Sequence, residues 1–134
     1  MSIELQVVLR ILLAAGLGAA IGYQRERAGK AAGLRTHILI CVGAALFTVA
    51  SLYGFGPTSD ASRVAAGVVA GIGFIGAGAI IHRGAGDIVA GLTTAATIWA
   101  VAAIGLAAGA GLYLVAGITT AITLVILFLP RHIR

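Results

Sequence analysis

The stretch from Val64 to His82, VAAGVVAGIGFIGAGAIIH, most constrains what this chain can fold into. It carries five glycines, whose missing side chains would let neighbouring helices approach its backbone: Gly67, Gly71, Gly73, Gly76 and Gly78. In water each interior glycine would destabilise a helix by about 0.8–1 kcal/mol relative to alanine. In lipid the backbone must satisfy its own hydrogen bonds, so a helix forms despite the poor propensity. The stretch therefore predicts a transmembrane packing helix at the centre of a small bundle. A broken helix that lines a ligand site is the alternative.

The rest of the chain has the same character. Of its 134 residues 60% are hydrophobic and only 10% are charged, too few charges for a domain that faces water. Apolar runs of span length recur, and they predict helices over about residues 5–24, 37–53, 64–82, 88–106 and 112–129. We expect residues 1–134 to form a single integral membrane domain. Its fold class would be all-α, a polytopic transmembrane helical bundle of about five helices.

An internal repeat divides this bundle. Ala15–Tyr23 (AGLGAAIGY) aligns with Ala66–Phe74 (AGVVAGIGF), and Ala32–Ala45 aligns with Ala90–Ala103. The first and third helices would run in the same direction, so the two hairpins would be parallel repeats about an axis along the membrane normal. The fifth helix has no counterpart, and we expect it to brace the pair.

Charges indicate the topology. Five spans would place seven of the nine basic residues on one side: Arg25, Arg27, Lys30, Arg35, Arg83, Arg131 and Arg134. The positive-inside rule then predicts an outside N-terminus and a cytoplasmic C-terminus. Arg10 lies inside the first apolar run. It would either snorkel to the interface or meet a polar partner on another helix.

The densest polar cluster precedes the second helix, and the fourth helix would begin at the same face. Helix starts present free N–H groups and a positive partial charge, which suit a phosphate, a lipid head group or an acidic protein segment. The predicted ligand- or partner-binding residues are Arg25, Glu26, Arg27, Lys30, Arg35, Thr36, His37, Asp87, Thr93 and Thr94. The alternative is that these cations only fix the topology and bind lipid loosely.

Other chemistry finds little support. The G-x-G-x-x-G pattern at Gly71–Gly76 lies in a membrane helix instead of following a strand, so it does not indicate a dinucleotide site. No nucleophile and base pair is visible, so we expect no enzyme and no cofactor. We expect no bound metal, although Glu26 and Asp87 leave a divalent cation open. Nucleic acid is not an expected partner. The lone Cys41 would be a small buried residue.

Three stretches closely resemble the MgtC/SapB family of bacterial inner-membrane proteins: Arg25–Phe47 (RERAGKAAGLRTHILICVGAALF), Ser62–Ile81 (SRVAAGVVAGIGFIGAGAII) and Val89–Tyr113. The resemblance implies about five spans and a link to adaptation to low magnesium and, in pathogens, to survival inside host cells. Family members are not established as magnesium transporters, and some are thought to act by binding other membrane proteins. Many carry a soluble ACT-like C-terminal domain, whereas this chain resembles the short form. The family often has proline where this chain has Ala31.

Two function hypotheses follow. The first is a regulatory membrane protein that engages a protein partner or an anionic ligand at its cytoplasmic face. The second is a small ion or solute transporter with its site at the junction of the repeats or of two protomers. In either case the expected partners are the lipid bilayer, a second copy in a homodimer, and other membrane proteins.

Overall fold

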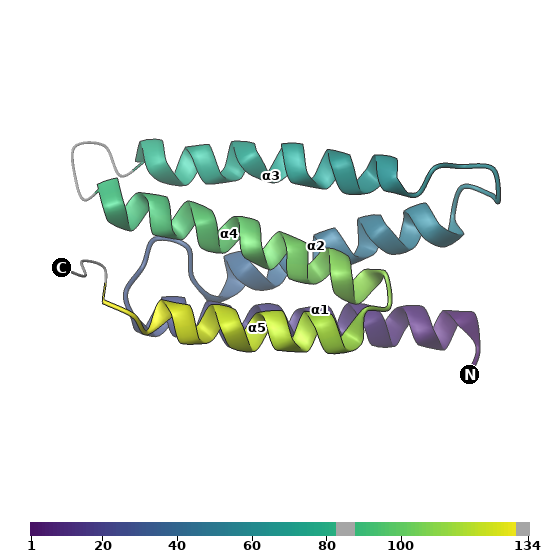
Figure 1. The fold of residues 1–134 in the computed structure, drawn as a ribbon, viewed down its shortest axis with the longest axis horizontal. Coiled ribbons are helices and arrows are strands. Elements are labelled where there is room, and N and C mark those ends of the chain that lie inside the picture. The colour runs from purple at the N-terminus through teal and green to yellow at the C-terminus, as the bar shows by residue number, and fades with distance from the viewer. Residues whose placement is uncertain (83–87, 131–134) are drawn as a thin grey trace.

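The computed structural model describes residues 1–82 and 88–130, and these residues form five helices with no strand among them. The helices are α1 (Ile3–Arg27), α2 (Leu34–Tyr53), α3 (Ser62–His82), α4 (Ile88–Gly109) and α5 (Tyr113–Leu127). They alternate in direction, so the chain start and residue 130 lie at opposite ends of the bundle (Figure 1). The predicted all-α bundle of five helices is confirmed.

Four of these helices, α1 to α4, are long and apolar enough to cross a membrane. The fifth, α5, has 15 residues. At 1.5 Å per residue such a helix is about 22 Å long, shorter than the roughly 30 Å hydrocarbon core of a bilayer. The predicted bundle therefore contains four helices of full span length and a shorter fifth.

The centre of the bundle is α4. It packs against each of the other four helices, whereas α3 lies at one edge and packs mainly on α4 (Figure 1). The prediction of a central helix over residues 64–82 is therefore wrong. Large apolar side chains of α3 such as Phe74, 82% exposed, face outward. In lipid such a face costs little, because acyl chains are as apolar as the side chain.

The closest helix contacts use glycines of α1 and α4. A Cβ on Gly18 would lie 2.8 Å from the Cβ of Cys41, and Gly22 lies equally close to the α2 backbone. On α4, Gly105 and Gly109 approach α2 in the same way. Two Gly-x-x-x-Gly pairs thus hold α2 closely against both α1 and α4. The buried thiol of Cys41 lies in this contact, as predicted.

The predicted packing glycines of α3 behave differently. A Cβ on Gly76 would lie 3.5 Å from the Cβ of Ala95 on α4. Open space surrounds the Cβ positions of the other four: Gly67, Gly71, Gly73 and Gly78. Packing at these four stays a prediction, and it concerns contacts beyond this chain.

Helix ends differ from the prediction where α1 meets α2. Helix α1 continues to Arg27 instead of ending near residue 24, and α2 begins at Leu34 instead of residue 37. The N–H of Ala28 donates to the carbonyl of Gln24 and so completes the last turn of α1. The connection is therefore short, and the charged residues before it are helical.

Asp60 caps the start of α3. Oδ1 of Asp60 accepts hydrogen bonds from the N–H of Ser62 (3.0 Å) and from its hydroxyl (2.7 Å). These bonds lower the pKa of the exposed Asp60 carboxyl. The Asp60 carboxylate forms no ion pair with the nearby Arg63 within the described chain, and it accepts hydrogen bonds from Ser62 instead.

Candidate functional site at the basic end

The last turn of α1 and the first turns of α2 and α4 lie at one end of the bundle (Figure 1). We call it the basic end, after Arg25, Arg27, Lys30 and Arg35. Nη2 of Arg25 donates a 2.9 Å hydrogen bond to Oγ1 of Thr94. Both side chains are buried, with 2% and 0% of their surface exposed. Two of the predicted site residues from distant parts of the sequence thus meet inside the bundle.

Helical spacing explains why Arg25 points inward. Gly18, Gly22 and Arg25 share one face of α1, since residues three and four apart lie above one another on a helix. The two glycines draw α2 against this face, and the fully buried Ile21 fills the core beside them. Burial of a cation is costly, and hydrogen bonds such as the one to Thr94 offset part of that cost.

His37 lies in the first turn of α2 and is fully buried. Its Nδ1 is 2.8 Å from the carbonyl oxygen of Gly33. A carbonyl only accepts, so Nδ1 carries the proton in this contact. Nε2 is then a buried acceptor with no hydrogen-bond partner among the described residues. The Cβ of His37 lies against Gly22 of α1, so His37 belongs to the α1–α2 contact and not to the surface.

The start of α2 already holds a carboxylate. Oε1 of Glu26 accepts a 3.2 Å hydrogen bond from the N–H of Leu34. A negative charge there is favoured by the helix dipole. Gly33 leaves room for it, because a Cβ at that position would collide with the Glu26 carboxylate. The N–H groups expected to be free for an anion are therefore partly used by the chain itself, and Glu26 acts as a helix cap.

Two cations of the basic end remain exposed. Arg27 lies with its guanidinium carbon 5.9 Å from the centroid of the Tyr23 ring. Arg35 is exposed on the first turn of α2, and Lys30 is half-buried in the connection. Unlike Arg25, the side chains of Arg27 and Arg35 can reach a ligand outside the bundle.

The remaining predicted site residues differ in how far they are buried. Thr36 and Thr93 are half-buried, and Asp87 lies outside the described residues. The three carboxylates that the structure describes, on Glu4, Glu26 and Asp60, are all exposed. Within residues 1–82 and 88–130 no three His, Cys, Asp or Glu side chains gather as a metal site would require.

The opposite end holds a second buried arginine. Nε of Arg10 donates to the Tyr113 hydroxyl (3.0 Å), and Nη1 donates to the Gly109 carbonyl (3.0 Å). Its guanidinium also lies over the ring of Tyr53, 5.5 Å from the centroid. We call this cluster the tyrosine end. Arg10 thus meets polar partners on other helices and does not snorkel to the interface.

Sequence reasoning missed these partners. Gly111 has φ +86° and lies against the Arg10 guanidinium, so the α4–α5 turn wraps around it. The available signal was an arginine in an apolar run together with tyrosines at the ends of two other predicted helices. Cations at a helix C-terminus and over aromatic rings are both favourable.

Four apolar helices of span length, together with arginines buried near both ends of the bundle, define a multi-pass membrane protein. The chain belongs to the MgtC family, which it matches over residues 11–134. The resemblance seen in the sequence is therefore confirmed.

Among curated relatives, the chain is 50% identical over 115 residues to the protein named "Putative magnesium transporter YhiD" of Escherichia coli (strain K12). That match covers 81% of this chain and 53% of YhiD. Protein SrpB of Synechococcus elongatus is 44% identical over 129 residues, which cover 88% of this chain and 71% of SrpB. Protein MgtC of Brucella abortus (strain 2308) is 49% identical over 104 residues, 78% of this chain and 42% of that relative. The chain thus spans about half the length of YhiD and less of MgtC. No solved structure matches it.

Proposed function

We propose that this chain is a regulatory protein of the bacterial inner membrane, linked to magnesium homeostasis, that engages a protein partner or an anionic ligand through the basic end. The link to magnesium is supported by the name of YhiD, a relative that is 50% identical to this chain. The regulatory role rests on the distribution of charge and on the packing of the bundle.

The proposed orientation places the basic end in the cytoplasm and the N-terminus outside. Arg25, Arg27, Lys30 and Arg35 lie at this end, whereas Arg63 lies at the start of α3 at the other end. Short cytoplasmic loops carry an excess of Lys and Arg, and the anionic inner leaflet attracts them. Arg10 counts little toward this balance, because its guanidinium is enclosed by the bundle.

The filled interior between the two buried arginines is the observation that carries the proposal. Buried apolar side chains occupy it: Ala14, Ile21, Cys41, Ala45, Val101, Ile104, Ala108 and Ala116. Mg²⁺ binds through carboxylates and water. No described carboxylate enters this core, and the guanidinium groups of Arg10 and Arg25 would repel a divalent cation. A magnesium pathway through a single copy of the described bundle is therefore disfavoured.

The exposed cations suit an anionic partner. Arg27 and Arg35 present guanidinium groups, which form paired hydrogen bonds with carboxylate and phosphate oxygens. Because Glu26 caps α2, recognition would depend on these side chains more than on the helix start. The buried Arg25 would position the surface by tying α1 to α4.

The second candidate function is that of a transporter, which the name of the relative YhiD favours. Since the interior of one copy is packed, its pathway would lie between protomers. Purified protein in liposomes loaded with a magnesium indicator separates the two candidates. The regulator predicts no protein-dependent Mg²⁺ influx. Influx above that of protein-free liposomes, saturating with external Mg²⁺, would contradict it.

A second experiment tests the basic end. Wild-type protein purified from native membranes after cross-linking should retain a partner that the Arg27→Ala/Arg35→Ala variant loses. Arg63→Ala, which removes an exposed cation at the other end, serves as the matched control and should retain the partner. Equal retention by all three proteins would argue against the basic end as the binding surface.

A further inference from the structure

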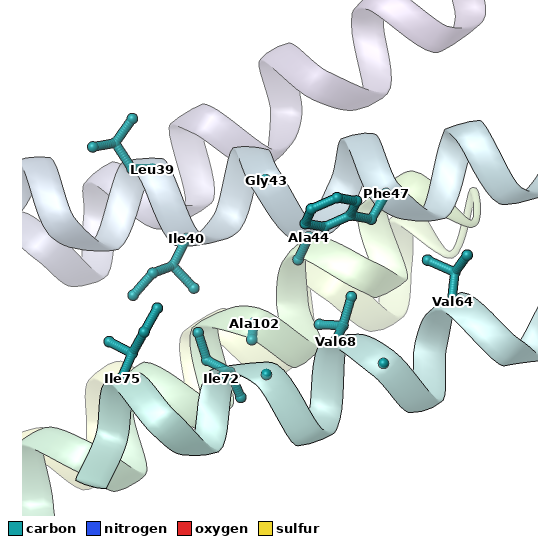
Figure 2. A pocket seen from close by; sticks show the side chains of 12 residues that line it. Leu39, Ile40, Gly43, Ala44, Phe47, Val64, Val68, Ile72, Ile75 and Ala102 are labelled. Atoms are coloured by element: carbon teal, nitrogen blue, oxygen red, sulfur yellow. The ribbon is translucent and has the colours of Figure 1, made fainter. Parts of the chain in front are cut away.

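An apolar groove runs between α2 and α3, with a volume of about 580 Å³ (Figure 2). Leu39, Gly43 and Phe47 of α2 form one wall, and Val64, Val68 and Gly71 of α3 form the other. Ala102 of α4 lies at its floor. Although α2 and α3 are consecutive, they splay apart and share far less contact than α1 and α2 do.

The internal repeat predicts a space elsewhere in the bundle that is equivalent to this groove. The sequence alignment relates Ala15–Tyr23 to the residues 51 positions later and Ala32–Ala45 to the residues 58 positions later, and we extend the first offset by one helical turn toward the start of α1. Val64, Val68 and Ile72 of the α3 wall thus correspond to residues of α1: Leu13, Leu17 and Ile21. Gly43 of the α2 wall corresponds to Val101 of α4. The groove between α2 and α3 is therefore equivalent to the space between α4 and α1.

That equivalent space is filled by α5. Ile21 and Val101 share one core cluster with Ala116 of α5. Leu13 and Leu17 pack against the same cluster, as do Leu124 and Leu127 of α5. The first hairpin thus has a helix seated on these positions, and the second hairpin has the same positions without one. By analogy with the first hairpin, we expect a helix to occupy the α2–α3 groove in the position that α5 has on α1 and α4.

Direction narrows the choice of occupant. Helix α5 runs parallel to α1 and antiparallel to α4 (Figure 1), so its counterpart would run parallel to α3 and antiparallel to α2. Two copies inserted the same way in one membrane are related by a two-fold axis along the membrane normal, which makes their α3 helices parallel. The α3 helix of a second copy therefore enters the groove with the required direction.

The surface of α3 suits this contact. Only 11% of its span is buried within the chain, against 50% for α4. Gly67 and Gly71 line the groove and have open space at their Cβ positions. They are four residues apart and lie on one face, the arrangement that lets two membrane helices approach closely.

The start of α3 also carries one acidic and one basic side chain, which could pair with those of a second copy. Asp60 and Arg63 are both exposed and are not paired with each other within the described chain. Because hydrogen bonds from Ser62 lower the pKa of the Asp60 carboxyl, it stays ionised at neutral pH. In a parallel arrangement Asp60 of one copy lies at the height of Arg63 of the other. The pair would therefore form twice across the two-fold axis, as exposed ion pairs that favour this register and add little to the affinity.

The available area is close to what a stable contact needs. A face two helices wide and one span tall measures roughly 20 Å by 30 Å, or about 600 Å² per copy. Specific interfaces bury about 800 Å² per partner. We infer that the chain forms a symmetric homodimer in which α3 of each copy occupies the α2–α3 groove of the other.

Matched glycine variants test this dimer. Gly71→Leu places a side chain in the groove, and Gly73→Leu places the same side chain on α3 outside the groove lining. At both positions an added Cβ has no other atom of the chain within 4 Å. Single-molecule photobleaching in liposomes over a range of protein-to-lipid ratios gives the dimer fraction. We expect Gly71→Leu to weaken dimerisation at least tenfold and Gly73→Leu to leave it unchanged.

Cysteine cross-linking gives a second readout that does not depend on a bulky substitution. In a Cys41→Ala background, Gly71→Cys should form a disulfide-linked dimer on mild oxidation in membranes. Phe74→Cys, at a position 82% exposed on α3 and outside the groove lining, should not. A protein that is monomeric at all ratios, or equal responses of the paired variants, would overturn the inference. So would native mass spectrometry that finds a lipid or another protein's helix lost specifically with Gly71→Leu.

Discussion

The two ends of the bundle each bury an arginine, but the surroundings of the two arginines differ. At the tyrosine end, Arg10 donates to the Tyr113 hydroxyl and to the Gly109 carbonyl and lies over two aromatic rings. At the basic end, the buried Arg25 donates to Thr94, while Arg27 and Arg35 are exposed. The difference teaches that a cation in an apolar run is not a site by itself. Its surroundings decide whether it only holds helices together or also supports a charged surface.

The tyrosine end is built as a clamp. Arg10 contacts the C-terminus of α4, the first residue of α5 and the last residue of α2 from its place on α1. The largest expected effect therefore comes from removing it. Hydrogen bonds to a charged group contribute about 1.5–3 kcal/mol each before coupling between them is considered.

Arg10→Ala should lower the free energy of unfolding by roughly 3 kcal/mol, because the Gly109 carbonyl and the Tyr113 hydroxyl both lose their donor. Unfolding in mixed detergent micelles, followed by circular dichroism, measures the change. Arg63→Ala removes an exposed cation at the same end and should change stability by less than about 0.5 kcal/mol. Equal stability of the two variants would mean that Arg10 is not a clamp.

Thr94→Val tests the link beneath the basic end. It keeps the shape of the side chain but removes the acceptor for Nη2 of Arg25, so we expect a loss of about 1–2 kcal/mol. The half-buried neighbour Thr93 provides the control, and Thr93→Val should cost less. If both variants unfold alike, the contact between α1 and α4 at Arg25 contributes nothing to stability.

Tyr113→Phe dissects the clamp further. The ring remains over the guanidinium of Arg10, but the hydroxyl acceptor is lost, so stability should fall by only about 1 kcal/mol. Tyr23→Phe at the exposed Arg27 is the comparison at the other end and should be neutral. A Tyr113→Phe loss as large as that of Arg10→Ala would show that neither stacking nor the bond to the Gly109 carbonyl adds to stability.

Much of this architecture was predictable from hydropathy and spacing. The five helices, the cap by Asp60 and the buried Cys41 follow from local patterns, since each depends on neighbours in the sequence. Thr97, Thr120 and Thr123 bond the carbonyl one turn back, as a threonine inside a membrane helix is expected to do.

Other features depend on which helix faces which, and local patterns do not contain that information. The glycine-rich stretch of α3 was expected at the centre, but the close packing falls to Gly18, Gly22, Gly105 and Gly109. Arg25 and Thr94 were both predicted site residues, and the sequence did not show that a hydrogen bond joins them inside the bundle. Glu26 was considered as a ligand and is a cap, because α1 extends one turn further than predicted.

The smallest expected change in stability belongs to the residue with the largest proposed role. Arg35→Ala removes an exposed guanidinium from the first turn of α2 and should leave stability within about 0.5 kcal/mol of the wild type. The most direct measurement is growth of a deletion strain in low magnesium, normalised to the amount of protein in the membrane. We predict that Arg35→Ala restores no growth although it inserts normally, whereas Arg63→Ala restores growth fully. Full growth with Arg35→Ala would contradict the assignment of the basic end as the functional surface.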